Sequence, residues 1–169
     1  MPTASIAHST TALPPALAHA AALDDEALIR LILQYHDAHI RDLIAALELA
    51  ERVAYVHGGS KAFPAALPGM LQDILGELRA HQAREESVIF PAIVEGRGAS
   101  LRLPVAAMAT DHEAAQDRLE RLVRLTRDYS PPEEACASWR RLYLFCRKFD
   151  EEFRTHIQLE ERVLFPRFL

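Results

Sequence analysis

The 169-residue sequence has few of the features that mark secreted, membrane-spanning or nucleic-acid-binding proteins. Its two cysteines, Cys136 and Cys146, are too few for a disulfide scaffold, and we expect both to be small buried side chains. No apolar run approaches the ~20 residues that a bilayer-spanning helix needs. The formal net charge of −5 argues against nucleic-acid and anionic-membrane partners, because both require a basic surface.

The first 23 residues contain no Lys or Arg, so they lack the positive segment of a secretory signal. Their Ala, Pro, Ser and Thr content predicts a flexible tail over residues 1–23. The remaining length fits one domain, residues 24–169, with a sizeable core. From these features we expect a cytoplasmic protein.

Glycine and proline are sparse outside the tail and divide the chain into four long segments rich in Ala, Leu, Glu and Arg. The breaks lie at residues 58–68, 96–104 and 130–132. Within each segment apolar residues recur three and four apart, which is typical of a core-facing helix, and no sustained alternation predicts a strand. Asp24 should cap the first helix, and Pro131 or Pro132 should be an early residue of the fourth. Because the connections are short, the pattern predicts an all-α, antiparallel up-down-up-down four-helix bundle.

Ionisable residues interrupt every apolar stripe at a position that should face the core. One such histidine alone would be an ordinary core residue or a partly exposed side chain. Burying several imidazoles and carboxylates without partners costs several kcal/mol for each group, so a set of six needs another explanation. The interrupting residues are His36, His81, Glu85, His112, His156 and Glu160.

A near-repeat indicates that these residues meet. HQAREESVIFP begins at His81 and HIQLEERVLFP begins at His156, and both place a Glu four residues after the His and end in Phe-Pro. His81 follows His36 by 45 residues and His156 follows His112 by 44, so each helical hairpin carries one lone histidine and one His-x-x-x-Glu pair. At a rise of ~1.5 Å per residue all six fall at one height, nearer the end with the 96–103 loop. The repeat predicts a metal site with pseudo-twofold symmetry.

The donor types predict two metal ions in this site. Residues four apart on a helix share a face, so each His–Glu pair can reach a common centre, where a carboxylate can bridge two ions. A single zinc ion normally takes four ligands, fewer than the six offered here. The mixed nitrogen and oxygen set favours iron, with manganese as an alternative and zinc as a substitute.

Five segments between Leu28 and Arg167 carry a family resemblance: QYHDAH, AHQAREESVIFP, TDHEAA, PPEEACASWRRLY and HIQLEERVLFPR. Together they resemble the hemerythrin-like HHE family and, within it, the di-iron RIC proteins that repair iron–sulfur clusters. The resemblance implies the same six metal ligands. Glu85 and Glu160 would bridge two non-haem iron ions, with an oxo or hydroxo bridge as an option.

Two departures from the family pattern limit what the resemblance implies. Oxygen-carrying hemerythrins have a further histidine one turn after the third-helix histidine, where this chain has Gln116. A water or hydroxide bridge could complete the ligand shell and leave positions open to small molecules. RIC proteins often carry a small N-terminal domain with a cysteine pair, and the first 27 residues here contain no cysteine.

The resemblance implies a stress protein that supports repair of iron–sulfur clusters damaged by nitric oxide or oxidants. It would donate iron to damaged or apo iron–sulfur proteins. The alternative is a sensor or scavenger that binds NO or O₂. An enzyme is less expected, since no Ser/His/Asp or reactive-cysteine arrangement is visible, although NO-reactive redox chemistry stays open. We expect a monomer.

Residues near the six candidate ligands carry secondary predictions. His57 should end the first helix ~31 Å from the site, out of reach. His39, one turn from His36, is open between a direct ligand and a supporting residue. Asp37, Asp111 and Glu113 flank candidate ligands, and we expect them to orient imidazoles by accepting their outer N–H groups.

Overall fold

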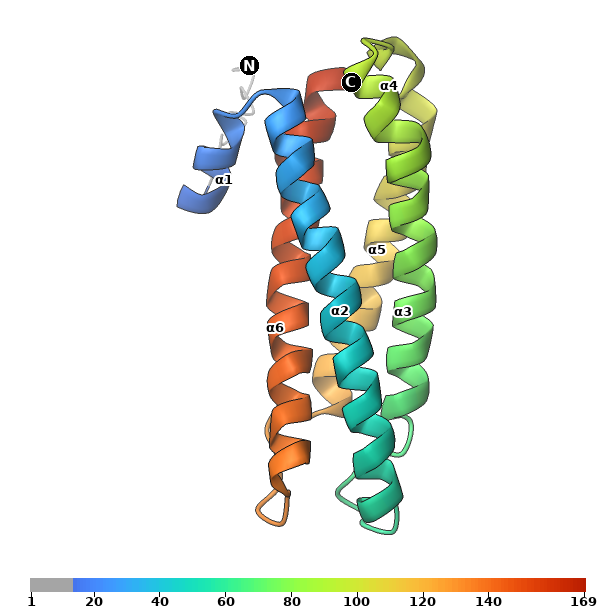
Figure 1. Cartoon of the computed structure of the whole chain (residues 1–169), viewed down its shortest axis with the longest axis vertical. Helices are drawn as coiled ribbons and strands as arrows, with labels where there is room; N and C mark the ends of the chain where they lie inside the picture. Colours follow the sequence, from blue (N-terminus) through green and yellow to red (C-terminus); the bar gives the residue numbers. More distant parts are fainter. Residues whose placement is uncertain (1–13) are drawn as a thin grey trace, which may run out of the picture.

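A computed structural model describes residues 14–169, and helices make up most of that range (Figure 1). Four long rods run antiparallel, which confirms the predicted all-α bundle, and no strand occurs between residues 14 and 169. The rods are α2 (Asp25–His57); α3 (Leu67–Arg84) continued by η1 (Glu85–Ile89) and α4 (Phe90–Val94); α5 (Arg102–Leu125); and α6 (Ala137–Leu159) continued by η3 (Glu160–Leu164) and η4 (Phe165–Phe168). The short α1 (Pro15–Ala21) precedes them, and η2 (Gly98–Ser100) lies in the loop before α5.

The ends of the rods follow local chemistry. Asp24 caps α2 as predicted, because its side chain accepts a hydrogen bond of 2.7 Å from the Ala27 amide. The prediction for the start of the last rod is wrong, since α6 begins only at Ala137. The Arg140 guanidinium bonds to the carbonyl oxygens of Glu133 and Ala135, which holds the segment after the prolines outside the helix.

The core consists of two apolar clusters at different heights of the bundle. The large cluster surrounds Trp139 and Phe149 and fills the end where α2 meets α3 and α5 meets α6. The small cluster contains Leu28, Ile32 and Leu164 and lies at the end with the 96–101 loop. Burial of each such large side chain contributes about 1.5–3 kcal/mol, so both ends are held firmly. The polar residues between the clusters therefore sit in a rigid frame.

The predicted flexible tail differs from the structure in part. Residues 1–13 lie outside the described range, but residues 15–21 form α1, which packs against α6 and η3. Leu17 and Ala20, three residues apart, are buried in the small cluster, and this apolar pair explains the docking. Arg167 adds contacts to Asp25 at 2.6 Å and to the Ala21 carbonyl oxygen at 3.2 Å. Of the helices described, none is long and apolar enough to cross a membrane.

Candidate metal centre

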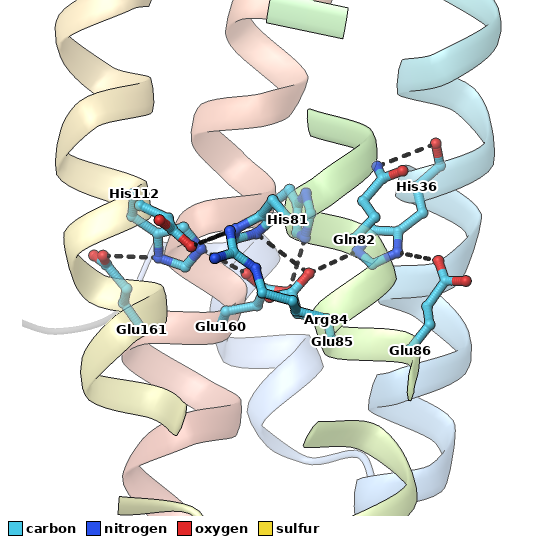
Figure 2. A network of polar contacts seen from close by, with 11 residues as sticks. His36, His81, Gln82, Arg84, Glu85, Glu86, His112, Glu160 and Glu161 are labelled. Atoms are coloured by element: carbon cyan, nitrogen blue, oxygen red, sulfur yellow. Dashed lines mark hydrogen bonds and ion pairs between the residues drawn. The ribbon is translucent and has the colours of Figure 1, made fainter. Parts of the chain in front are cut away.

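The six ionisable residues predicted from the sequence converge between the two clusters. Each of the four rods supplies at least one of them, and Figure 2 shows the five that it labels pointing toward one another. None of the six is more than 6% exposed. The layer is flanked by the small cluster on the side of the 96–101 loop, as the helical rise predicts. The residues are His36, His81, Glu85, His112, His156 and Glu160.

The six residues form two overlapping groups of four. One group contains His36 and His156, the other contains His81 and His112, and Glu85 and Glu160 belong to both. Within each group the donor atoms lie within 4.8 Å of one another. The two imidazole pairs also match, with ring centroids 4.9 Å apart in both and interplanar angles of 55° and 53°. This is the pseudo-twofold arrangement that the sequence repeat predicts.

All four histidines turn Nε2 toward the two carboxylates. Glu85 Oε2 lies 3.3 Å from His36 Nε2 and 3.2 Å from His81 Nε2. The Glu160 carboxylate lies 3.1 Å from His112 Nε2 and 2.9 Å from His156 Nε2. Each glutamate thus serves one imidazole from its own rod and one from the other rod of its hairpin.

A π-helical turn begins at each of the two glutamates, Glu85 and Glu160, and the helical periodicity of the sequence does not predict it. The amide of Phe90 bonds to the carbonyl oxygen of Glu85, five residues earlier, and Phe165 does the same with Glu160. The proline after each phenylalanine has no N–H, so the ordinary helical bond ends there. The repeated Phe-Pro therefore closes a widened turn, and such turns are frequent at functional sites.

Outer partners hold three of the imidazoles, and two of these partners were not predicted. His36 Nδ1 donates to Glu86 Oε1 at 2.7 Å, and His112 Nδ1 donates to Glu161 Oε1 at 3.1 Å (Figure 2). His81 Nδ1 lies 3.7 Å from Asp111 Oδ2.

The prediction that sequence neighbours orient the ligands is only partly correct. Asp111 faces His81 Nδ1 at 3.7 Å, which is beyond hydrogen-bond distance. Asp37 and Glu113 are exposed, and within residues 14–169 neither forms a hydrogen bond or an ion pair with an imidazole. Adjacent helical residues are ~100° apart around the axis, so a residue next to an inward-facing histidine points elsewhere. The sequence feature that marks the outer partners of His36 and His112 is the second glutamate in each Glu-Glu pair.

The carboxylates and imidazoles shift one another's protonation. Burial acts to lower the pKa of His36, but the neighbouring Glu85 and Glu86 carboxylates raise it above its ordinary value. The pKa of His112 is likewise raised by Glu160 against the effect of burial. Burial acts to raise the pKa of Glu160, yet His156 and His112 bring it well below the usual range. The layer therefore favours an ionised Glu160, and His36 and His112 hold a proton more readily than a free imidazole does.

His39 lies beside the centre but outside both groups of four. Its ring is fully buried, stacks on His156 with a centroid distance of 5.4 Å, and meets Phe149 and Phe153 edge-on. Burial, helped by His156, lowers the pKa of His39 to about 3. The geometry places it as a neutral neighbour of His156. His57 ends α2, as predicted, against Trp139 in the large cluster.

Unsatisfied polar atoms inside the layer test whether metal ions fit there. The buried Nε2 atoms of His36, His81 and His112, both Glu85 oxygens and Glu160 Oε2 lack hydrogen-bond partners in the described chain. Buried polar groups in proteins are normally hydrogen-bonded, and an unpaired one is costly. A cation in each group of four would satisfy these atoms with two nitrogens and two shared carboxylates. The residues present fit such a pair of ions.

A cavity of about 300 Å³ reaches one half of the centre. Its lining includes His81 and His112 together with apolar residues such as Leu78, Leu119 and Phe153. Arg84 pairs with Asp111, and Arg118 with Glu77, among the polar residues of the same lining. A small uncharged molecule could approach the candidate ligands from this side.

Comparison with known proteins agrees with this geometry. Residues 27–168 match the family model described as the hemerythrin HHE cation-binding domain. The chain is 39% identical over 139 residues to the iron-sulfur cluster repair protein YtfE of Yersinia pseudotuberculosis serotype IB (strain PB1/+), covering 82% of this chain and 63% of that protein. It is 38% identical to the protein of the same name from Yersinia pestis (strain Pestoides F), with the same coverage. The chain thus spans about 63% of the length of these relatives.

Proposed function

The chain belongs to the hemerythrin HHE cation-binding domain family, and from this premise we propose that it is a non-haem di-iron protein that supports iron–sulfur cluster repair. The observation that carries the proposal is the sharing of Glu85 and Glu160 between two pairs of imidazoles. Two carboxylates held in common are suited to bridging two metal ions, whereas one ion would leave donors unused.

The proposed ligands are the six residues of the layer, four imidazoles and two carboxylates. Bound iron would supply reversible one-electron chemistry and positions for small ligands, and manganese or zinc could substitute for it in vitro. The protein's own contribution is to fix the donors. It holds His36 and His112 from outside through Glu86 and Glu161, and it surrounds the layer with apolar side chains that limit access of water.

The charge of the donor set supports iron donation. Two glutamates contribute −2 against +4 from two ferrous ions, which leaves a net charge of about +2 before any bridging ligand is counted. Fewer anionic donors than in carboxylate-rich di-iron enzymes should weaken metal retention and disfavour strongly oxidised iron. We therefore propose that iron is cargo, delivered to iron–sulfur proteins damaged by nitric oxide or oxidants. The Yersinia relatives are named iron–sulfur cluster repair proteins, which supports this role.

Transfer of iron to an apo iron–sulfur protein tests the proposal. The chain, purified without added metal, should contain about two iron ions, as in other di-iron bundles. Mixed anaerobically with an apo ferredoxin, sulfide and a thiol reductant, it should lose iron while cluster absorption appears in the acceptor. The Asp37→Asn variant is a matched control because Asp37 is exposed and follows a candidate ligand directly. Iron that stays bound, with no cluster formed, would exclude donation.

The cavity beside His81 and His112 supports a second candidate function, binding of NO or O₂ by a sensor or scavenger. Its apolar lining suits a small uncharged ligand. Optical spectra of the reduced, iron-loaded chain under NO and then under argon separate the two functions. A stable adduct that reverses without loss of iron would favour the sensor, and release of iron on exposure to NO would favour donation.

A further inference from the structure

The second glutamate of each Glu-Glu pair lies outside the two groups of four, yet both second glutamates make the same contact. Glu86 follows Glu85 and reaches back to His36 on α2, and Glu161 follows Glu160 and reaches back to His112 on α5. The contacts measure 2.7 and 3.1 Å between Oε1 and Nδ1 (Figure 2). In each hairpin the first glutamate faces the layer, while the second accepts a hydrogen bond from the outer nitrogen of a histidine on the neighbouring rod.

Packing does not explain the two glutamates. The side chain of Glu86 is 47% exposed and that of Glu161 is 37% exposed, whereas the imidazoles they contact are nearly inaccessible. A partly exposed ion pair contributes little to folding stability. What such a carboxylate does control is the imidazole: as the acceptor of Nδ1–H it selects the tautomer, orients the ring and raises the basicity of Nε2.

The other two imidazoles are held differently. The Nδ1 atom of His81 has the longer contact to Asp111, which also pairs with Arg84 at 2.5 Å. His156 Nδ1 finds no hydrogen-bond partner in the described part of the chain, and its ring lies against aromatic side chains instead. Close carboxylate support is therefore given to one imidazole in each hairpin.

We propose that Glu86 and Glu161 are positioning residues that lock His36 and His112 with Nε2 toward the centre. They act on the metal ions through the imidazoles, and within residues 14–169 neither forms an ion pair with another residue of the layer. The inference rests on the proposed metal centre but requires neither iron nor cluster repair. Removing either carboxylate should weaken metal binding while leaving the metal-free fold intact.

Cobalt(II) binding to metal-free protein tests the inference through affinity and through the imidazole protons. In Glu86→Gln and Glu161→Gln the amide oxygen can still accept a hydrogen bond but carries no charge, so cobalt affinity should fall ~10-fold or more in each. Alanine at either position should weaken binding further, because no acceptor remains. Proton NMR of the cobalt-loaded protein should show an exchangeable, paramagnetically shifted N–H signal from His36 that moves in Glu86→Gln and not in Glu161→Gln. The His112 signal should behave conversely.

Glu151→Gln is the matched control, since Glu151 is exposed on α6 and forms no ion pair with the described residues. Its cobalt affinity and N–H signals should equal those of the wild type, and all variants should melt at the wild-type temperature when metal-free. Unchanged affinity and N–H signals in both glutamine variants would overturn the inference, as would an equal change in the control. Wild-type protein that binds no cobalt would overturn the metal centre itself, and normal cobalt results with failed iron transfer would overturn only the repair function.

Discussion

The two hairpins of the bundle present the same donors at the same spacing but in different surroundings. Each contributes a lone histidine, a His-x-x-x-Glu pair, a π turn and an outer glutamate. Around His81 the chain places Asp111, Arg84 and a cavity, whereas around His156 it places Tyr35, His39 and Phe153. The comparison indicates that the donors keep one geometry in both hairpins, while the side chains that surround His81 and His156 differ.

Replacing the shared carboxylates should have the largest effect, and it tests whether the two hairpins contribute equally to metal binding. Glu85→Ala and Glu160→Ala should each lose at least one of two metal ions, because either glutamate belongs to both groups of four. A metal present at 100 times its dissociation constant stabilises the folded state by about 2.7 kcal/mol, so the melting temperature in excess metal should fall clearly in both variants. Metal analysis and thermal melts measure the two effects. Retention of two ions by either variant would show that its glutamate is not shared.

His39 tests the surroundings of His156 alone. Its buried nitrogens have no hydrogen-bond partners within residues 14–169, and an unsatisfied buried polar group costs about 1–3 kcal/mol. His39→Leu should therefore raise the free energy of unfolding of the metal-free protein by up to that amount and leave the metal content unchanged. Chemical denaturation and metal analysis provide the readouts. A variant that loses metal would instead assign His39 as a ligand, the alternative that the sequence leaves open.

The sequence predicts the six residues of the inner layer better than the outer residues that hydrogen-bond to them. Helical periodicity and the repeat locate all six converging residues, because each lies on an apolar stripe whose direction is set by 3.6 residues per turn. Glu86 and Glu161 lie off those stripes, and their direction depends on π turns that no simple period predicts. The helix at residues 15–21 was missed because an Ala- and Pro-rich composition hides the Leu17–Ala20 pair that buries it.

Asp111 tests the surroundings of His81, with a smaller expected effect. Its distance of 3.7 Å from His81 Nδ1 exceeds the distances that Glu86 and Glu161 make to their histidines, and it shares its charge with Arg84. We expect Asp111→Asn to weaken cobalt affinity by less than the ~10-fold lower limit for outer partners of metal-bound histidines. Affinity measured by chelator competition, beside Glu86→Gln and Asp37→Asn, gives the ranking. An effect larger than that of Glu86→Gln would contradict the link between contact distance and support.

Both cysteines lie outside the first hairpin. Modification of either thiol should leave the metal centre unchanged, but the two thiols should differ in reactivity. Cys146 is buried as predicted, and burial raises its pKa to about 12, so at pH 8 only about 10⁻⁴ of the thiol is ionised. The prediction of burial is wrong for Cys136, which is half-buried because it lies in the loop just before α6. A thiol reagent at pH 8 should therefore modify Cys136 in the folded protein and Cys146 only on unfolding, with the metal content unchanged throughout. Rapid modification of both thiols, read by mass spectrometry of peptides, would show that the large cluster opens far more readily than its packing implies.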